Sequence, residues 1–509
     1  MQDVAERISR EAARRHYTVS VLAMDEYEVT ELPGAARVVF VTSTMGQGDP
    51  PSNMKLFWRF LLRRDLPHDS LARLAFATFG LGDSHYQKYN VTAKKLHKRL
   101  EGLGAHPLIP LGLGDDQHPT GYEATLGPWL KQLWATLRAS CPLVTGLSDP
   151  PEDNEFVAEL DPCRLIVEVA APADEGPAQG HVAATPTIAQ LCAAAAELDR
   201  VVRAAMPVDP KILRGGGRET QGGRVSTEVG IEGRADAAYG PKNPLVTTVL
   251  SNDYLTAEGS GNEARHVVID VAELPCASSP SSSTSGGSYA PGDCLAVMPW
   301  IAVGDGDSYW EGVTEVLRRA GLAPDALVRL HPAMGVSDGH VPATLSARTL
   351  IAGALDITSA SPRQYFFEVA SHFARDKNER ERLRYFASAE GRDDLYRYNQ
   401  RERRTVLEIL DDFKSVEMPL GWMLQVVPRL QPRLFSISSS PLAHPGQIHL
   451  TVSLVNWKTH YGRRRLGLCS NMIAAKVPGA KLAVWLEKVR WCTCRSGQTL
   501  TSYNSFPFS

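Results

Sequence analysis

Three glycine-rich, polar loops in the first 120 residues combine the residue types that can hold a flat aromatic ligand. They span 43–51, 80–90 and 112–116, and Tyr86 lies in the second. Glycine lets the backbone come close to a flat ring and adopt positive φ. Tyr86 can stack on such a ring, and the Asp, Ser and Asn side chains of these loops can hydrogen-bond its edge. The loops therefore indicate a binding site for a planar heteroaromatic molecule.

Short apolar runs precede the three loops, and helical patterns separate them. The predicted strands span 37–42, 73–79 and 106–111, and the predicted helices span 2–16, 53–64, 91–103 and 122–138. This alternation predicts a doubly wound parallel sheet, in which ligands bind beyond the carboxyl ends of the strands. One such loop alone would more often be an ordinary turn, since Gly and Asp are turn residues. Three such loops at the same edge of one sheet favour a ligand-binding site over ordinary turns.

The sequence of these loops resembles a known family. Residues 44–51 and 79–90 are similar to the FMN loops of the diflavin reductases, above all the NADPH-dependent reductases of cytosolic iron–sulfur cluster assembly. The resemblance implies that Tyr86 stacks on the isoalloxazine ring. It places around the FMN Ser43, Thr44, Met45, Gly46, Leu81, Gly82, Asp83, Ser84, His85, Tyr86, Gln87, Lys88, Tyr89, Asn90 and Asp116. Many relatives carry an aromatic residue where Met45 stands, and a thioether is a softer cover for a ring.

The beginning of the chain departs from the family pattern. The family starts with a strand and a Ser/Thr-Gly-Thr loop whose backbone N–H groups grip the FMN phosphate at a helix N-terminus. Residues 1–8 match only the helix that follows that loop. We therefore expect a sheet without this central strand, and weak FMN binding or none.

A second group of candidate residues lies near the end of the chain. In 429–440, Arg433 can pair with a pyrophosphate, Phe435 can lie on an isoalloxazine ring, and the Ser436 hydroxyl can reach flavin N5, where a hydride arrives. Taken alone, Arg-x-Phe-Ser fits a plain edge strand better. Residues 466–470 then open a helix predicted at 470–476, whose backbone N–H groups can contact a second phosphate.

These segments together resemble the FAD-binding barrel of the ferredoxin-reductase superfamily. The resemblance assigns to FAD Arg433, Leu434, Phe435, Ser436, Gly467, Leu468, Cys469 and Ser470, with Ser436 as the catalytic residue. It also suggests Arg403, although this residue equally fits a run of solvated charges. Cys469 has no His and carboxylate beside it in the sequence, so a packing thiol is the better interpretation.

The expected fold is multidomain, α/β plus β. A flavodoxin-like doubly wound parallel sheet occupies 1–140, and 141–240 is a largely irregular linker in which 187–205 could form one helix. A FAD-binding antiparallel β-barrel of ferredoxin-reductase type follows. It takes 241–304 and 411–488, with a helical connecting subdomain at 305–410 as an insert. An irregular tail at 489–509 stands where the family has its NADPH-binding domain, so we expect a chain truncated at both ends.

Composition excludes several classes of protein. Over 509 residues the net charge is −3, which gives no electrostatic case for a nucleic-acid partner. The sequence contains no run of about 18 apolar residues, so we expect no membrane-spanning helix. The first residues lack the apolar core of a secretory signal. Eight scattered cysteines predict neither a disulfide framework nor a metal site, and we expect a cytoplasmic protein.

The resemblance implies electron transfer from NADPH through FAD and FMN to a protein acceptor, an iron–sulfur protein of the anamorsin type. Flavins suit this path because they take up two electrons together and release them singly. Two other interpretations stay open. The chain is a catalytically impaired splice or gene-model fragment that retains only FAD or partner binding, or it is a single-flavin reductase fed by another protein. A flavodoxin-like scaffold without cofactor explains the second half poorly.

Overall fold

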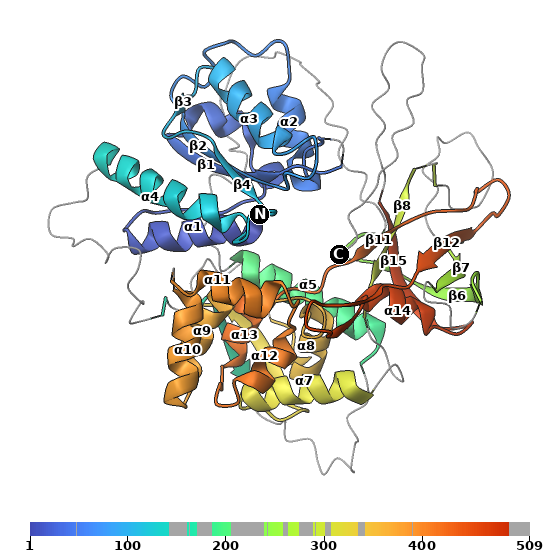
Figure 1. The fold of residues 1–509 in the computed structure, drawn as a ribbon. Coiled ribbons are helices and arrows are strands. Elements are labelled where there is room, and N and C mark those ends of the chain that lie inside the picture. The colour runs from blue at the N-terminus through green and yellow to red at the C-terminus, as the bar shows by residue number, and fades with distance from the viewer. Residues whose placement is uncertain are drawn as a thin grey trace.

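A computed structural model describes most of the chain. It covers residues 1–141, 160–170, 186–204, 239–257, 263–273, 289–300, 307–333 and 342–487, apart from residues 47, 162, 242, 291 and 389. These residues form a flavodoxin-like domain, a helical connecting subdomain and an antiparallel-sheet domain (Figure 1). The predicted loop at 277–288 and the predicted tail at 489–509 lie outside the described residues.

The flavodoxin-like domain contains a parallel sheet with helices on both faces, as predicted. Strand β2 pairs in parallel with β1, β3 and β4, so the carboxyl ends of the strands share one edge. Phe76 and Ala77 point to opposite faces, each into its own apolar cluster. In chain order the elements are α1 (Gln2–Arg14), η1 (Met24–Glu26), η2 (Val29–Gly34), β1 (Arg37–Ser43), η3 (Ser52–Met54), α2 (Lys55–Leu61), β2 (Ala75–Gly82), α3 (Val91–Gly102), β3 (His106–Pro107), β4 (Gly112–Asp115) and α4 (Glu123–Ser140).

The third predicted strand differs from the observed one. Instead of one strand at 106–111, the sheet contains the two-residue β3 and then β4, which pairs from Gly112 opposite Phe79. Pro107 and Pro110 lack the N–H that a continuous ladder needs, and this accounts for the break.

The connecting subdomain is mainly helical and has the largest apolar core of the described residues. It also contains a small antiparallel sheet, β10-β9-β5, which the helical pattern of 305–410 did not predict. Its elements are β5 (Leu165–Val169), α5 (Ile188–Ala204), α7 (Asp307–Arg319), β9 (Leu327–Pro332), β10 (Leu345–Ser346), α8 (Ala347–Ala354), α9 (Gln364–Phe373), α10 (Lys377–Ala387), α11 (Arg392–Leu395), η4 (Tyr396–Gln400), α12 (Val406–Asp412) and α13 (Leu420–Val426).

Part of the predicted linker belongs to this core. Within 141–240, β5 pairs with β9 along its full length, and α5 buries Leu191, Leu198 and Val201 completely. The expectation of a largely irregular linker is therefore wrong for these two segments. The helix expected at 187–205 is confirmed as α5, but its place in a core was not predicted, because an Ala-rich helix buries only every third or fourth residue and resembles a low-complexity stretch.

The third domain is built on a six-stranded antiparallel sheet in the order β11-β8-β15-β6-β7-β12. The sheet curves until its two ends meet at one bridge, Ile437 with Leu450; the described residues form no further ladder there. A hairpin, β13–β14, and helix α14 follow β12. The elements are β6 (Leu245–Tyr254), β7 (Ala264–Asp270), β8 (Cys294–Met298), β11 (Arg433–Ser436), β12 (Gln447–Ser453), β13 (Asn456–Lys458), β14 (Arg464–Leu466), α14 (Leu468–Ala474) and β15 (Lys481–Glu487).

In the described part of the chain, each helix is too short or too polar to cross a bilayer.

The packing of α5 gives a first prediction. Replacing Leu198 by Ala removes a completely buried side chain, so we expect a loss of about 2–5 kcal/mol in unfolding free energy. Urea denaturation followed by circular dichroism measures this loss. Leu442→Ala is the matched control, because Leu442 is 93% exposed and should cost little. Equal effects of the two substitutions would contradict the placement of α5 in the core.

Candidate functional site

The loop after β1 is held against the start of α3. Thr44 Oγ1 accepts a hydrogen bond of 3.2 Å from the backbone N–H of Thr92. The loop closes on itself because the Met45 N–H donates to the carbonyl of Asp49 at 2.9 Å, with Gly46 at φ 47° in the left-handed region. Glycine suits this conformation. The Met45 side chain is left 43% exposed beside the loop.

The loop after β2 is tied to the loop after β4 by one carboxylate. Asp115 Oδ1 accepts from the N–H of Ser84 at 2.9 Å and from that of Gln117 at 3.1 Å. Desolvation opposes ionisation, but these hydrogen bonds outweigh it and hold the pKa of Asp115 below its usual value. The carboxylate therefore stays charged near neutral pH and fixes the two loops together.

Asn90 completes the link between these loops. It is buried in a left-handed conformation at φ 51°, and its Nδ2 donates to the Gly114 carbonyl at 3.0 Å. A Cβ on Gly80 or Gly82 would lie 2.7 or 2.8 Å from the Asn90 side chain, so only glycine allows this approach. The Tyr89 hydroxyl donates to the carbonyls of Leu113 and Gly114.

The predicted FMN residues thus gather at one edge of the sheet. All of them lie on these three loops, and the Asp116 N–H donates to the Gly82 carbonyl at 2.9 Å. The Tyr86 ring is 58% exposed and has no side-chain partner among the described residues. An open aromatic ring, an exposed thioether at Met45 and tightly tied glycine loops fit a flavin ring. The individual FMN contacts, and the weak binding expected without a phosphate loop, stay predictions.

The second site is built on β11. This strand pairs antiparallel with β8, with Arg433 opposite Val297 and Ser436 opposite Cys294. Phe435 packs against the apolar interior of the sheet, while Leu434 and Ser436 are exposed on the other face. The Arg433 guanidinium donates to the carbonyl of Gln431 at 2.8 Å, which orients its charged end.

Helix α14 places the second predicted FAD segment, Gly467 to Ser470, beside β8, the strand that pairs with β11. Cys469 Sγ lies 3.9 Å from the carbonyl of Val297, the residue opposite Arg433. Burial raises the pKa of Cys469 to about 12, and the nearby Arg433 opposes this only weakly. The thiol therefore stays protonated and packs, which agrees with its interpretation from the sequence.

Arg403 differs from the charged residues around it. It is one of three non-glycine residues with positive φ among the described residues, at φ 47°, and its side chain is exposed. Within the described part of the chain its guanidinium has no ion-pair or hydrogen-bond partner, whereas Arg404 is paired with Asp412. An unpartnered guanidinium on a fixed turn suits an anionic ligand such as a pyrophosphate. The FAD contacts of Arg403, Arg433, Leu434, Phe435, Ser436 and 467–470 stay predictions.

Comparison with known proteins assigns the two domains. Residues 1–129 match the flavodoxin family and residues 239–472 match the FAD-binding domain family. The chain is 40% identical over 496 residues to NADPH-dependent diflavin oxidoreductase 1 of Arabidopsis thaliana, covering 96% of this chain and 70% of that protein. It is 34% identical over 493 residues to the protein of the same name from Xenopus laevis, covering 96% and 71%.

The chain belongs to the diflavin oxidoreductase family. This confirms the resemblance and the fold class predicted from the sequence, and the cofactors of the two domains are FMN and FAD. Members of this family are oxidoreductases, so the chemistry of the two sites is electron transfer. Sequence reasoning missed the buried Glu402 and the hydroxyl of Thr459 that donates to it, because neither residue belongs to a motif.

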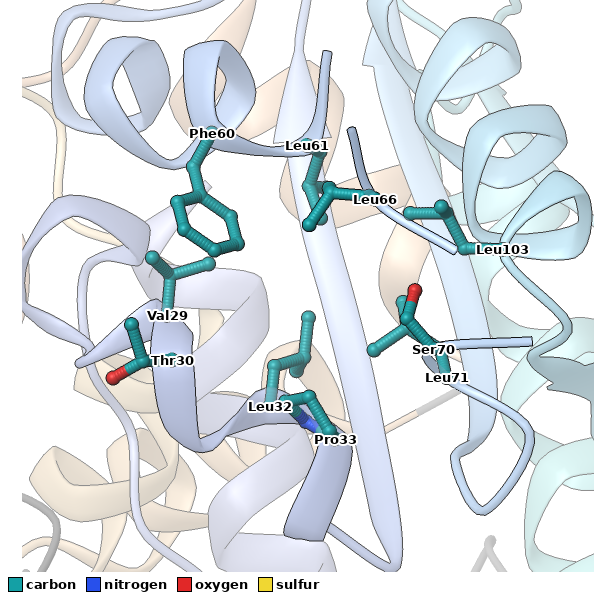
Figure 2. A pocket seen from close by; sticks show the side chains of 10 residues that line it. All are labelled: Val29, Thr30, Leu32, Pro33, Phe60, Leu61, Leu66, Ser70, Leu71 and Leu103. Carbon is teal, nitrogen blue, oxygen red and sulfur yellow. The ribbon is translucent and has the colours of Figure 1, made fainter. Parts of the chain in front are cut away.

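A small cavity in the flavodoxin-like domain is not part of either site. It has a volume of about 160 Å³ and lies between η2, the end of α2 and the segments that precede β2 and β3, at the amino ends of the strands (Figure 2). Its walls are almost entirely aliphatic or aromatic. The flavin loops lie at the carboxyl ends, on the opposite edge of the sheet.

The exposed tyrosine provides a second prediction. Tyr86→Ala removes the stacking ring, so we expect the FMN dissociation constant of the full chain to rise about 10- to 100-fold. FAD binding should be unchanged because its predicted contacts lie on other domains. Flavin fluorescence titration of the deflavinated chain measures both. Tyr385→Ala, on α10 of the connecting subdomain, is the control. A change in FAD affinity, or none in FMN affinity, would contradict the assignment.

The cysteine provides a third prediction. Since the thiolate is the reactive form, Cys469 should resist alkylation by iodoacetamide at pH 8 in the folded chain and react after unfolding. The partly exposed Cys141 should react first. Peptide mass spectrometry resolves the two sites. Equal rates in the folded state would show that Cys469 is neither buried nor protonated.

Proposed function

We propose that the chain carries electrons from NADPH through FAD and FMN to a protein acceptor, an iron–sulfur protein of the anamorsin type in cytosolic iron–sulfur cluster assembly. NADPH stands in the names of the relatives, and the two flavin domains lie in one chain. The observation that carries the proposal is the direct contact of the flavodoxin-like domain with the connecting subdomain. The cytoplasm is the compartment that this role requires.

The contact runs along one face of α1. Arg7, Arg10 and Arg14 recur at spacings of three and four residues, so they share a face, while Val4 and Ile8 pack on the sheet. Arg14 pairs with Glu368 of α9 at 2.8 Å, and the Arg10 guanidinium lies 3.8 Å from the centre of the Tyr365 ring. We name these two contacts the α1 seam.

A carboxylate from α4 extends the seam. Glu123 pairs with Arg7 at 2.9 Å inside the flavodoxin-like domain and with Arg392 of α11 at 3.7 Å. Desolvation disfavours the charge on Arg7, but Glu123 and Glu11 outweigh it and keep the pKa of Arg7 above its usual value. Charges rather than a large apolar patch are therefore prominent at this contact, as in interfaces that open and close.

The chain's residues have distinct tasks on this path. When bound, FAD takes up two electrons as a hydride and FMN passes electrons on one at a time. Arg433 and Arg403 would hold the pyrophosphate, Phe435 would cover a ring face, and the Ser436 hydroxyl would stand at the end of β11, where a hydride arrives. The exposed Tyr86 edge is open to a protein acceptor.

Electron transfer to a purified [2Fe–2S] protein of the anamorsin type tests the proposal. The full chain is loaded with both flavins and reduced without oxygen by light, with EDTA as the electron donor and a catalytic amount of deazaflavin, and is then mixed with the oxidised acceptor. Bleaching of the cluster absorbance, slowed in Tyr86→Ala, is the expected result. A heme protein serves as a control acceptor. Transfer to the heme protein but not to the cluster would contradict the acceptor and leave the diflavin chemistry in place.

The α1 seam provides a fourth prediction. Arg14→Ala breaks the ion pair with Glu368, worth about 1 kcal/mol, so the flavodoxin-like domain should separate more often from the connecting subdomain. Small-angle X-ray scattering should then show a larger maximum dimension, approached by the wild type at high salt. Arg63→Ala is the matched control, since Arg63 pairs with Asp65 within its own domain. Equal scattering of all three proteins would contradict the seam.

A further inference from the structure

One buried carboxylate joins the connecting subdomain to the hairpin that leads into α14. Glu402 is 2% exposed. It accepts a hydrogen bond of 2.5 Å from the Thr459 hydroxyl and one of 3.3 Å from the backbone N–H of Tyr461. Both donors belong to the turn of the β13–β14 hairpin, 57 and 59 residues away in the sequence. A buried carboxylate is costly without such donors, so the turn must keep this geometry.

The hairpin in turn holds the segment that contains Glu402. Arg465 of β14 donates to the backbone carbonyl of Glu402 at 2.9 Å and pairs with Glu408 of α12 at 2.9 Å. Arg463 also pairs with Glu408, at 3.2 Å. Residue 465 is two positions before Gly467, where the predicted phosphate segment begins. These contacts therefore connect two predicted FAD segments that are more than 60 residues apart in the sequence.

Arg403 lies between two residues that are fixed in place. Before it, Glu402 is anchored to the hairpin. After it, the Arg404 guanidinium donates to the Tyr398 carbonyl at 2.9 Å and pairs with Asp412. Between these anchors Arg403 adopts φ 47°, a conformation that costs an L-residue about 1–2 kcal/mol. Among the described residues none contacts its guanidinium by a hydrogen bond or ion pair, so no such contact in this part of the protein offsets the cost of the left-handed conformation.

We propose that Glu402 is a positioning residue for FAD binding: by locking the β13–β14 turn to the start of α12, it holds Arg403 in the left-handed conformation that presents its guanidinium to the FAD pyrophosphate. This inference rests on the assignment of Arg403 to FAD. Strain at an exposed arginine is explained when the ligand, rather than the protein, supplies the partner. Asn or Gly would otherwise be the natural residue at this position.

A double-mutant cycle in the full chain tests the proposal, with FAD and FMN affinities measured by fluorescence titration after deflavination. Arg403→Gly should weaken FAD binding about 10- to 100-fold, the range for one charged hydrogen-bonding group. It should also raise thermal stability, since glycine relieves the strain. Glu402→Ala should weaken FAD binding about tenfold in the wild type. In the Arg403→Gly background it should have little further effect, because Glu402 acts through Arg403.

Several controls keep the outcomes distinct. Glu381→Gln removes an exposed carboxylate of the same subdomain and should change nothing. FMN affinity reports whether the flavodoxin-like domain remains folded. Thr459→Val removes the hydroxyl donor and should mimic Glu402→Ala if the latter fails to fold. Additive losses from Glu402→Ala and Arg403→Gly would show that Glu402 acts on FAD through the hairpin and the 467–470 segment instead, and would overturn its role in positioning Arg403. An unchanged FAD affinity in Arg403→Gly would overturn the assignment of Arg403 to FAD.

Discussion

The stretch of the connecting subdomain from α9 to α12 is the constraint on which both flavin sites depend. Its α9 and α11 receive the flavodoxin-like domain through Arg14–Glu368 and Glu123–Arg392. Its next turn anchors the β13–β14 hairpin through Glu402. Because one short stretch of chain meets both neighbours, a shift of these helices would change the position of both sites at once. The connecting subdomain therefore joins the two other domains and is more than an insert.

The connecting subdomain is attached to its two neighbours by different kinds of interaction. The α1 seam and its extension through Glu123 rely on one cation–π contact and on partly exposed ion pairs, which are individually weak and sensitive to salt. The hairpin attachment relies on a carboxylate that is 2% exposed and bonded to one hydroxyl and one N–H. Breaking the hydrogen bonds of the hairpin attachment leaves a carboxylate buried without partners. Breaking the ion pairs of the α1 seam returns their charges to water. We therefore expect salt to weaken the contact of the flavodoxin-like domain more than the attachment of the hairpin.

Much of this architecture was predictable from the sequence. Glycine and polar residues after each strand predicted three loops at one edge of the sheet, and the parallel strands place them there, because position at a sheet edge and residue type are both local properties. The α5 helix was missed as a core element, since Leu191 and Leu198 stand among alanines and their burial depends on the partners that α8 and β9 provide. Arg403 could not be separated from its charged neighbours without the backbone φ. Glu402 gave no signal at all, because its partners, Thr459 and Tyr461, come from a distant hairpin.

A chain that uses both flavins needs two sites that do not compete for them. Equilibrium dialysis of the deflavinated full chain against FMN, FAD and both together measures this directly, followed by acid release and separation of the bound flavins. The account predicts one FMN and one FAD per chain at saturation, with each amount unchanged by the other flavin. Displacement of one flavin by the other, or a chain that binds no FAD, would contradict it.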